Sequence, residues 1–192
     1  PHRKRDRALV ERARLQVTET VLIHGGAGGV GAIAVQVAKA IGARVLATAR
    51  GSDAALVERL GASAVIDFKR EDYVDAVDRL TEGKGVDVVL DTIGRDTLSR
   101  APRILSEDGR VVTLVDTATP QNLIDAWGRN ATYHFVFSRQ SAGKLDALTR
   151  LLERGLVVPQ VGLEFSLDDV ARAHARYEEG RLKGKIVLRV KS

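Results

Sequence analysis

The chain of 192 residues is long enough for one large α/β domain but short for two, and its apolar fraction of 44% is typical of globular proteins. The absence of cysteine excludes disulfides, thiolate zinc sites and cysteine nucleophiles. No apolar run approaches the roughly 20 residues that cross a bilayer, and no secretory signal follows the basic start. We therefore expect a cytoplasmic protein without a membrane segment. Most of the net charge of +5 lies in residues 1–14, where six Arg and Lys residues stand against two acidic ones, and a short basic head of this kind favours a solvated segment over a nucleic-acid arm.

From residue 21 to residue 115, short β-branched runs alternate with helix-like segments, the βαβ rhythm of a parallel sheet with right-handed crossovers. The predicted strands are 21–24, 44–48, 64–67, 87–90 and 110–114, and the predicted helices are 31–41, 53–60, 72–80 and 97–105. The later part predicts a loop at 117–122, a strand at 132–137, helices at 144–154 and 167–179, and a last strand at 185–190.

A glycine-rich turn joins the first predicted strand to the first helix. Gly26, Gly28 and Gly31 fit G-x-G-x-x-G, in which the glycines allow a tight turn, a close approach of backbone N–H groups to a pyrophosphate, and close packing of helix on strand. The predicted pyrophosphate loop comprises Gly26, Ala27, Gly28, Gly29, Val30 and Gly31. A flavodoxin-like fold without a dinucleotide is the alternative.

The same loop also satisfies the short-chain dehydrogenase pattern G-x-x-x-G-x-G through Gly25, Gly29 and Gly31. That class requires Tyr-x-x-x-Lys. The residues four positions after the three tyrosines are Val77, Phe137 and Arg181, so the short-chain class is disfavoured.

Selection between NADH and NADPH takes place at the end of the second strand, where an acidic side chain binds the ribose and a basic one binds a 2′-phosphate. No carboxylate stands at this tip, whereas Arg50 offers a planar donor fork and Ser52 a hydroxyl. The pattern therefore favours NADPH. In the alternative, Arg50 is an ordinary solvated side chain and Asp53 binds the ribose of NADH.

Taken in order along the chain, these motifs resemble the cofactor domain of the medium-chain dehydrogenase/reductases, which are alcohol dehydrogenase-like, in the zeta-crystallin-like quinone oxidoreductase branch. The resemblance rests on 27–31, on Leu60-Gly61-Ala62, on Val65-Ile66-Asp67-Phe68, on 85–91 and on Gly184-Lys185-Ile186-Val187-Leu188. It implies an α/β fold with a Rossmann-type doubly wound parallel sheet. The implied domains are an N-terminal helix or linker (1–18), a dinucleotide-binding domain (19–165), and a C-terminal helix and strand (166–192).

The resemblance also implies site residues. Phe68 occupies a position that packs on the adenosine, Gly94, Leu114 and Val115 lie near the nicotinamide, and Phe137 belongs to a segment whose loop approaches the same ring. The edge strand 132–137 is the element through which related subunits pair, so a homodimer is expected.

Departures from the family pattern are equally informative. A GroES-like substrate domain precedes the cofactor domain in the family and is missing here, so the final strand is expected to lack its partners. Without cysteine and with only His2, His24, His134 and His174, widely scattered, the chain predicts no zinc; His24 and His174 are interpreted as structural.

The implied activity is transfer of hydride from NADPH to a quinone or an α,β-unsaturated carbonyl, with this chain supplying the cofactor half and turning over poorly by itself. The catalytic residues are unknown, because no acid–base constellation is recognisable. The alternative is a non-catalytic module for dinucleotide binding or dimerisation.

Overall fold

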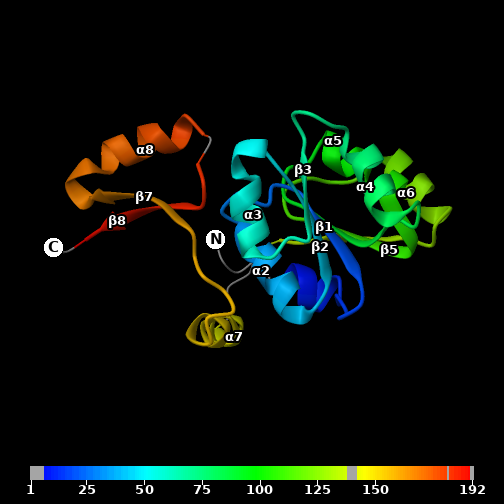
Figure 1. Ribbon diagram of the computed structural model, residues 1–192, viewed down its shortest axis with the longest axis horizontal. Helices are drawn as coiled ribbons and strands as arrows, with labels where there is room; N and C mark the ends of the chain where they lie inside the picture. The colour runs from blue at the N-terminus through cyan, green and yellow to red at the C-terminus, as the bar shows by residue number, and fades with distance from the viewer. Residues whose placement is uncertain (1–6, 138–141, 181, 191–192) are drawn as a thin grey trace.

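The computed structural model describes residues 7–137, 142–180 and 182–190 (Figure 1). Its centre is a sheet of six parallel strands in the order β3-β2-β1-β4-β5-β6. The strands are β1 (Thr20–Ile23), β2 (Arg44–Ala49), β3 (Ala64–Asp67), β4 (Val86–Asp91), β5 (Leu105–Thr113) and β6 (Thr132–Phe135). The strand order reverses between β1 and β4, which confirms the predicted α/β Rossmann-type doubly wound sheet and locates its switch point.

Helices cover both faces of the sheet because successive strand residues point to opposite sides. Val21 and Ile23 pack on one side with α2 (Gly31–Ile41) and α3 (Ala54–Leu60). Leu22 packs on the other side with α4 (Tyr73–Thr81), α5 (Asp96–Ser99) and the 3₁₀ turn η3 (Ala101–Ile104). All three strand side chains have no exposed surface, so both faces are core.

Two predicted elements after β4 are wrong. The predicted helix 97–105 is divided into α5 and η3, since Pro102 has no N–H to donate to a continuing helix. The predicted loop 117–122 instead contains the start of α6 (Pro120–Trp127), which Thr119 and Asn122 close with a capping box. The local signal, a Thr before Pro, was present in the sequence.

The C-terminal part forms a separate small unit. After α7 (Ala142–Glu153), the strand β7 (Val161–Ser166), the turn η4 (Leu167–Asp169), α8 (Val170–Glu178) and β8 (Lys185–Arg189) follow in order. Figure 1 shows this unit beside α3, away from the six-stranded sheet. The expectation that the last strand lacks partners is wrong, because β8 pairs in parallel with β7, a strand that was not predicted.

The described part of the basic head, residues 7–14, is less solvated than expected. In the π-helix η1 (Arg7–Arg12), Leu9 has no exposed surface and joins the core. Arg110 of β5 donates to the carbonyl of Ala13 and pairs with Glu19, which holds the segment against the sheet. Within the ranges that the structure covers, no helix is both long and apolar enough to cross a membrane.

Candidate functional site

The glycine-rich loop lies at the carboxyl end of β1 and is held against the end of β2. The Gly25 N–H donates to Thr48 Oγ1 at 3.1 Å, and the Gly26 N–H donates to the Thr48 carbonyl at 2.8 Å. The Gly28 N–H turns back to the Gly25 carbonyl at 2.9 Å. These bonds fix a tight turn at the switch point, where parallel α/β sheets bind ligands.

The loop forms a tight glycine cradle, too closely packed to admit a side chain at Gly26 or Gly31. A Cβ on Gly31 would overlap the Gly25 carbonyl, and one on Gly26 would lie 2.9 Å from the Cβ of Ala47. Helix α2 begins here with Val30 as its N-cap, and no side chain caps it. Backbone carbonyls accept from its first turn, since the Ala32 N–H donates to the Gly28 carbonyl at 2.9 Å and the Ile33 N–H to the Val30 carbonyl at 3.2 Å. The positive end of the helix dipole still makes this end suited to an anion.

The end of β2 turns into the short 3₁₀ turn η2 (Gly51–Asp53), which carries the predicted cofactor-selecting residues. Arg50 is partly buried at the start of the turn, and Ser52 is exposed. The Asp53 carboxylate is engaged: Ser52 Oγ donates to it at 3.3 Å, and Lys183 Nζ lies 2.8 Å from its Oδ1. Lys183 was not predicted to belong to this site.

A pocket of about 270 Å³ opens beside the loop, at the carboxyl ends of β1 to β4. Its lining includes His24, Gly25, Thr48, Phe68, Tyr73, Ile93 and Arg100. The Phe68 ring is 47% exposed and the Ile93 side chain 57% exposed, so apolar surface faces the opening from both sides. The structure therefore brings Phe68 together with the glycine loop.

The loops after β4 and β5 are joined by one buried carboxylate. Asp91 has no exposed surface and accepts from the Gly94 N–H at 3.0 and 3.1 Å, from Thr97 Oγ1 at 2.8 Å and from Thr113 Oγ1 at 3.0 Å. Gly94 has φ +81°, which favours glycine. Asp91 thus sets the shape of the loop that carries Gly94.

Of the residues assigned to the nicotinamide side, Gly94, Leu114 and Val115 are brought together. The Leu114 N–H donates to the Asp91 carbonyl at 3.1 Å, and the Val115 side chain is 55% exposed. Phe137 stands apart: it follows β6 and is 83% exposed, with β4 and β5 between its strand and β1.

His24, at the base of the pocket, is fully buried. Its Nδ1 lies 3.3 Å from Thr48 Oγ1, and its ring meets the Tyr73 ring edge-on with centroids 4.9 Å apart. Burial lowers the pKa of His24 to about 4, against the opposing influence of Asp91 and Asp96. The imidazole is therefore neutral at pH 7.

The described residues do not fit a zinc ion. His24, His134 and His174 lie after β1, on β6 and on α8 respectively, and His2 is outside the described residues. Across the described ranges no group of three or more His, Asp or Glu side chains is placed to hold a metal. No chemical step is assigned to a metal in this chain.

A family model and a curated relative both match most of the chain. Residues 60–188 match the family described as zinc-binding dehydrogenase. The quinone oxidoreductase of Mus musculus is 34% identical over 197 residues, covering 95% of this chain and 58% of the mouse protein.

Solved structures of related proteins superpose on nearly the whole chain. The quinone oxidoreductase from Coxiella burnetii superposes with a TM-score of 0.85 at 28% identity, covering 98% of this chain and 57% of that one. A structure described as an NAD-dependent alcohol dehydrogenase gives a TM-score of 0.89 at 28% identity, with 98% and 56% covered. The chain thus spans a little over half the length of these relatives.

Proposed function

Because the chain belongs to the zinc-binding dehydrogenase family, a family of oxidoreductases, we propose that it is the NADPH-binding part of a zinc-independent reductase. The proposed reaction is hydride transfer to a quinone or an α,β-unsaturated carbonyl. In this proposal residues 19–165 are the dinucleotide-binding domain. The substrate site also needs residues that correspond to the part of these relatives that this chain does not cover.

The glycine cradle at the switch point is the observation that carries the proposal. A Cβ at Gly26 would clash with Ala47 and one at Gly31 with the Gly25 carbonyl, so glycine is needed for this close turn. The start of α2 lies at the turn, and the positive end of the helix dipole favours an anion there. A dinucleotide pyrophosphate provides the matching negative charge. The adenosine would then lie in the adjoining pocket, between Phe68 and Ile93.

The other half of the dinucleotide would extend across β4 and β5. Gly94 and the exposed Val115 are near neighbours there, because the Asp91 carboxylate ties both loops to one centre. The reduced nicotinamide supplies the hydride when it is bound. The chain's own residues orient the ring and shield it, and none of them is assigned as a proton donor.

Preference for NADPH rests on the end of β2. Arg50 can offer a charge-assisted pair of hydrogen bonds to a 2′-phosphate, and Ser52 is exposed beside it. Asp53 is the residue that would favour NADH. Since its carboxylate is 14% exposed and already pairs with Lys183, it is less available for a ribose hydroxyl.

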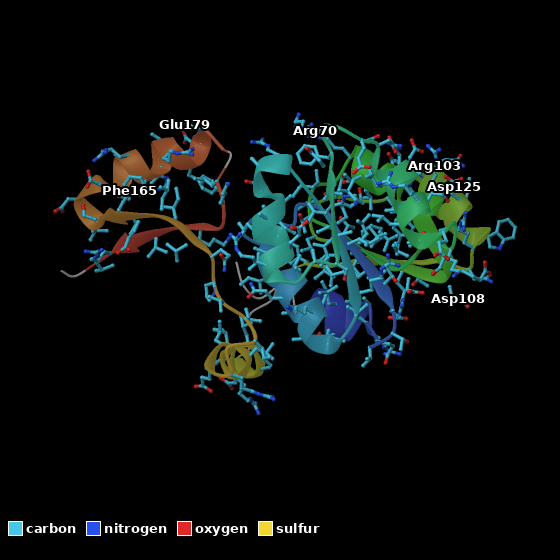
Figure 2. All side chains as sticks on the ribbon, viewed as in Figure 1. Arg70, Arg103, Asp108, Asp125, Phe165 and Glu179 are labelled. Atoms are coloured by element: carbon cyan, nitrogen blue, oxygen red, sulfur yellow. The ribbon has the colours of Figure 1, made fainter. Side chains whose placement is uncertain are left out.

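Calorimetric titration with NADPH and NADH at matched salt tests the proposal. We expect clear preference for NADPH, and Arg50→Glu should weaken NADPH binding by about 1–3 kcal/mol through loss of a charge-assisted bond. Arg103→Glu is the matched control: Arg103 precedes β5 at the opposite end of the sheet and is labelled near α6 in Figure 2. Equal affinity for both dinucleotides would refute the NADPH assignment, and no binding of either would refute the site.

Turnover separates a reductase from a purely binding module. The full-length protein that contains this chain should oxidise NADPH in the presence of a quinone or an enone. Tight binding of NADPH without turnover of either acceptor class would favour the non-catalytic alternative.

A further inference from the structure

We propose that Lys183 and Lys185 of the C-terminal unit complete the phosphate side of the dinucleotide site, and that Lys183 selects the 2′-phosphorylated form. This inference rests on the proposed function and adds residues that lie more than 130 positions after Arg50 in the chain. We call residues 183–185 the basic turn.

The basic turn is fixed on the glycine loop by the backbone. The Gly184 N–H donates to the Ala27 carbonyl at 3.3 Å, and the Lys185 N–H donates to the Gln160 carbonyl at 2.8 Å. Gly184 has φ +72°, and a Cβ there would overlap the Gln160 carbonyl. Glycine is therefore required between the two lysines, and it holds them at a defined place beside the loop.

Lys183 reaches the end of β2. Its Nζ lies 2.8 Å from Asp53 Oδ1 and 3.3 Å from the Ser52 carbonyl oxygen, and its side chain remains 54% exposed. Two consequences follow. The ammonium neutralises the Asp53 carboxylate, which would otherwise repel a 2′-phosphate, and it supplies a cation next to Ser52, where that phosphate would be bound.

Lys185 lies over the other part of the site. Its Nζ is so close to Gly29 that a Cβ on Gly29 would collide with it. The ammonium thus stands near the start of α2, where the helix dipole is also positive. A pyrophosphate placed between them would be attracted by both. Because NADH and NADPH share this group, Lys185 should support both dinucleotides equally.

The test compares Lys183→Gln, Lys185→Gln and Lys84→Gln by titration with NADPH and NADH. We expect Lys183→Gln to weaken NADPH binding about tenfold and to leave NADH binding unchanged or slightly stronger. Lys185→Gln should weaken both about equally, by several-fold. Lys84 is 79% exposed and pairs with Glu82 just before β4, so its variant should change neither affinity.

The outcomes distinguish this inference from the proposed function. Preference for NADPH in the unmodified chain, combined with an unchanged preference in Lys183→Gln, would overturn the role of Lys183 while the proposed function stands. Binding of neither dinucleotide would overturn both. Thermal unfolding of each variant completes the test. If Lys183→Gln lowers the melting temperature and weakens NADH and NADPH binding equally, Lys183 has a structural role, and its proposed selection of NADPH is overturned.

Discussion

At the scale of single residues, His24 contributes a pH dependence to the stability of the folded chain. Its imidazole is fully buried between Thr48 and Tyr73, and burial holds its pKa near 4, below the ordinary value of about 6.5. The protonated form is therefore less favourable in the folded chain than in the unfolded chain. The stabilising effect of neutral His24 is complete above about pH 6.5, is lost as pH falls toward 4, and changes no further below that value.

We predict that this single group lowers the free energy of unfolding by about 2 kcal/mol between pH 7.5 and pH 5. Urea unfolding at both pH values should show the loss in the unmodified chain, and His24→Asn should show a loss smaller by about that amount. His174→Asn, at an exposed position on α8, should retain the full dependence. An identical pH dependence in all three proteins would contradict the assignment.

At the scale of elements, Gln36 connects α2 to the segment that leads to β7. Its buried amide donates to the carbonyls of Ala32 at 2.8 Å and Val158 at 3.1 Å, and it accepts from the Val158 N–H at 2.7 Å. A side chain on a helix thus forms hydrogen bonds with both the carbonyl and the N–H of a residue 122 positions later. This anchor fixes where the C-terminal unit begins and hence where the basic turn can lie.

Gln36→Leu preserves the approximate volume but removes all three hydrogen bonds. We predict a loss of about 1–3 kcal/mol in the free energy of unfolding, because polar groups are left unpaired, and faster amide hydrogen exchange at Val158. Gln121→Leu is the control: Gln121 is exposed on α6, where it donates to Asp125, and its change should stay within about 0.5 kcal/mol. Unchanged exchange at Val158 in Gln36→Leu would remove the case for an anchor.

At the scale of the whole molecule, the open edge of the sheet suggests how copies associate. Within the described ranges β6 pairs only with β5, and Phe135 and Phe137 near its end are 51% and 83% exposed. An unpaired edge with exposed aromatic side chains favours pairing with a second strand. We therefore expect a homodimer through residues 132–137.

Sedimentation equilibrium provides the measurement. The double variant Phe135→Lys with Phe137→Lys should raise the dimer dissociation constant at least tenfold, since burying each ring on association is worth about 1.5–3 kcal/mol. Tyr177→Lys, on α8 at a site that is 69% exposed, should leave it unchanged. A dimer insensitive to the double variant would place the interface elsewhere, and a monomeric parent chain would refute the pairing.

Most of the sheet was predictable because its signals are local. Alternating apolar runs and glycine C-caps predicted β3 and α2 with their observed bounds, and the glycines at 26, 28 and 31 indicated the turn between β1 and α2. These patterns arise from the periodicity of strands and helices and from the conformational freedom of glycine. Such properties belong to short segments and do not require knowledge of the fold.

The tertiary structure alone decided which distant residues share the site. β7 alternates apolar Val161, Leu163 and Phe165 with Gly162, Glu164 and Ser166, a strand signal that the sequence prediction missed. Its pairing with β8, however, joins two segments that are separated by η4 and α8, and no local pattern identifies that partner. The Asp91 centre and the approach of Lys183 to Asp53 likewise join segments far apart in sequence. By itself, the sequence determined the fold class and the glycine loop, because local periodicity encodes both. The surroundings of that loop depend on long-range packing, which only the folded chain establishes.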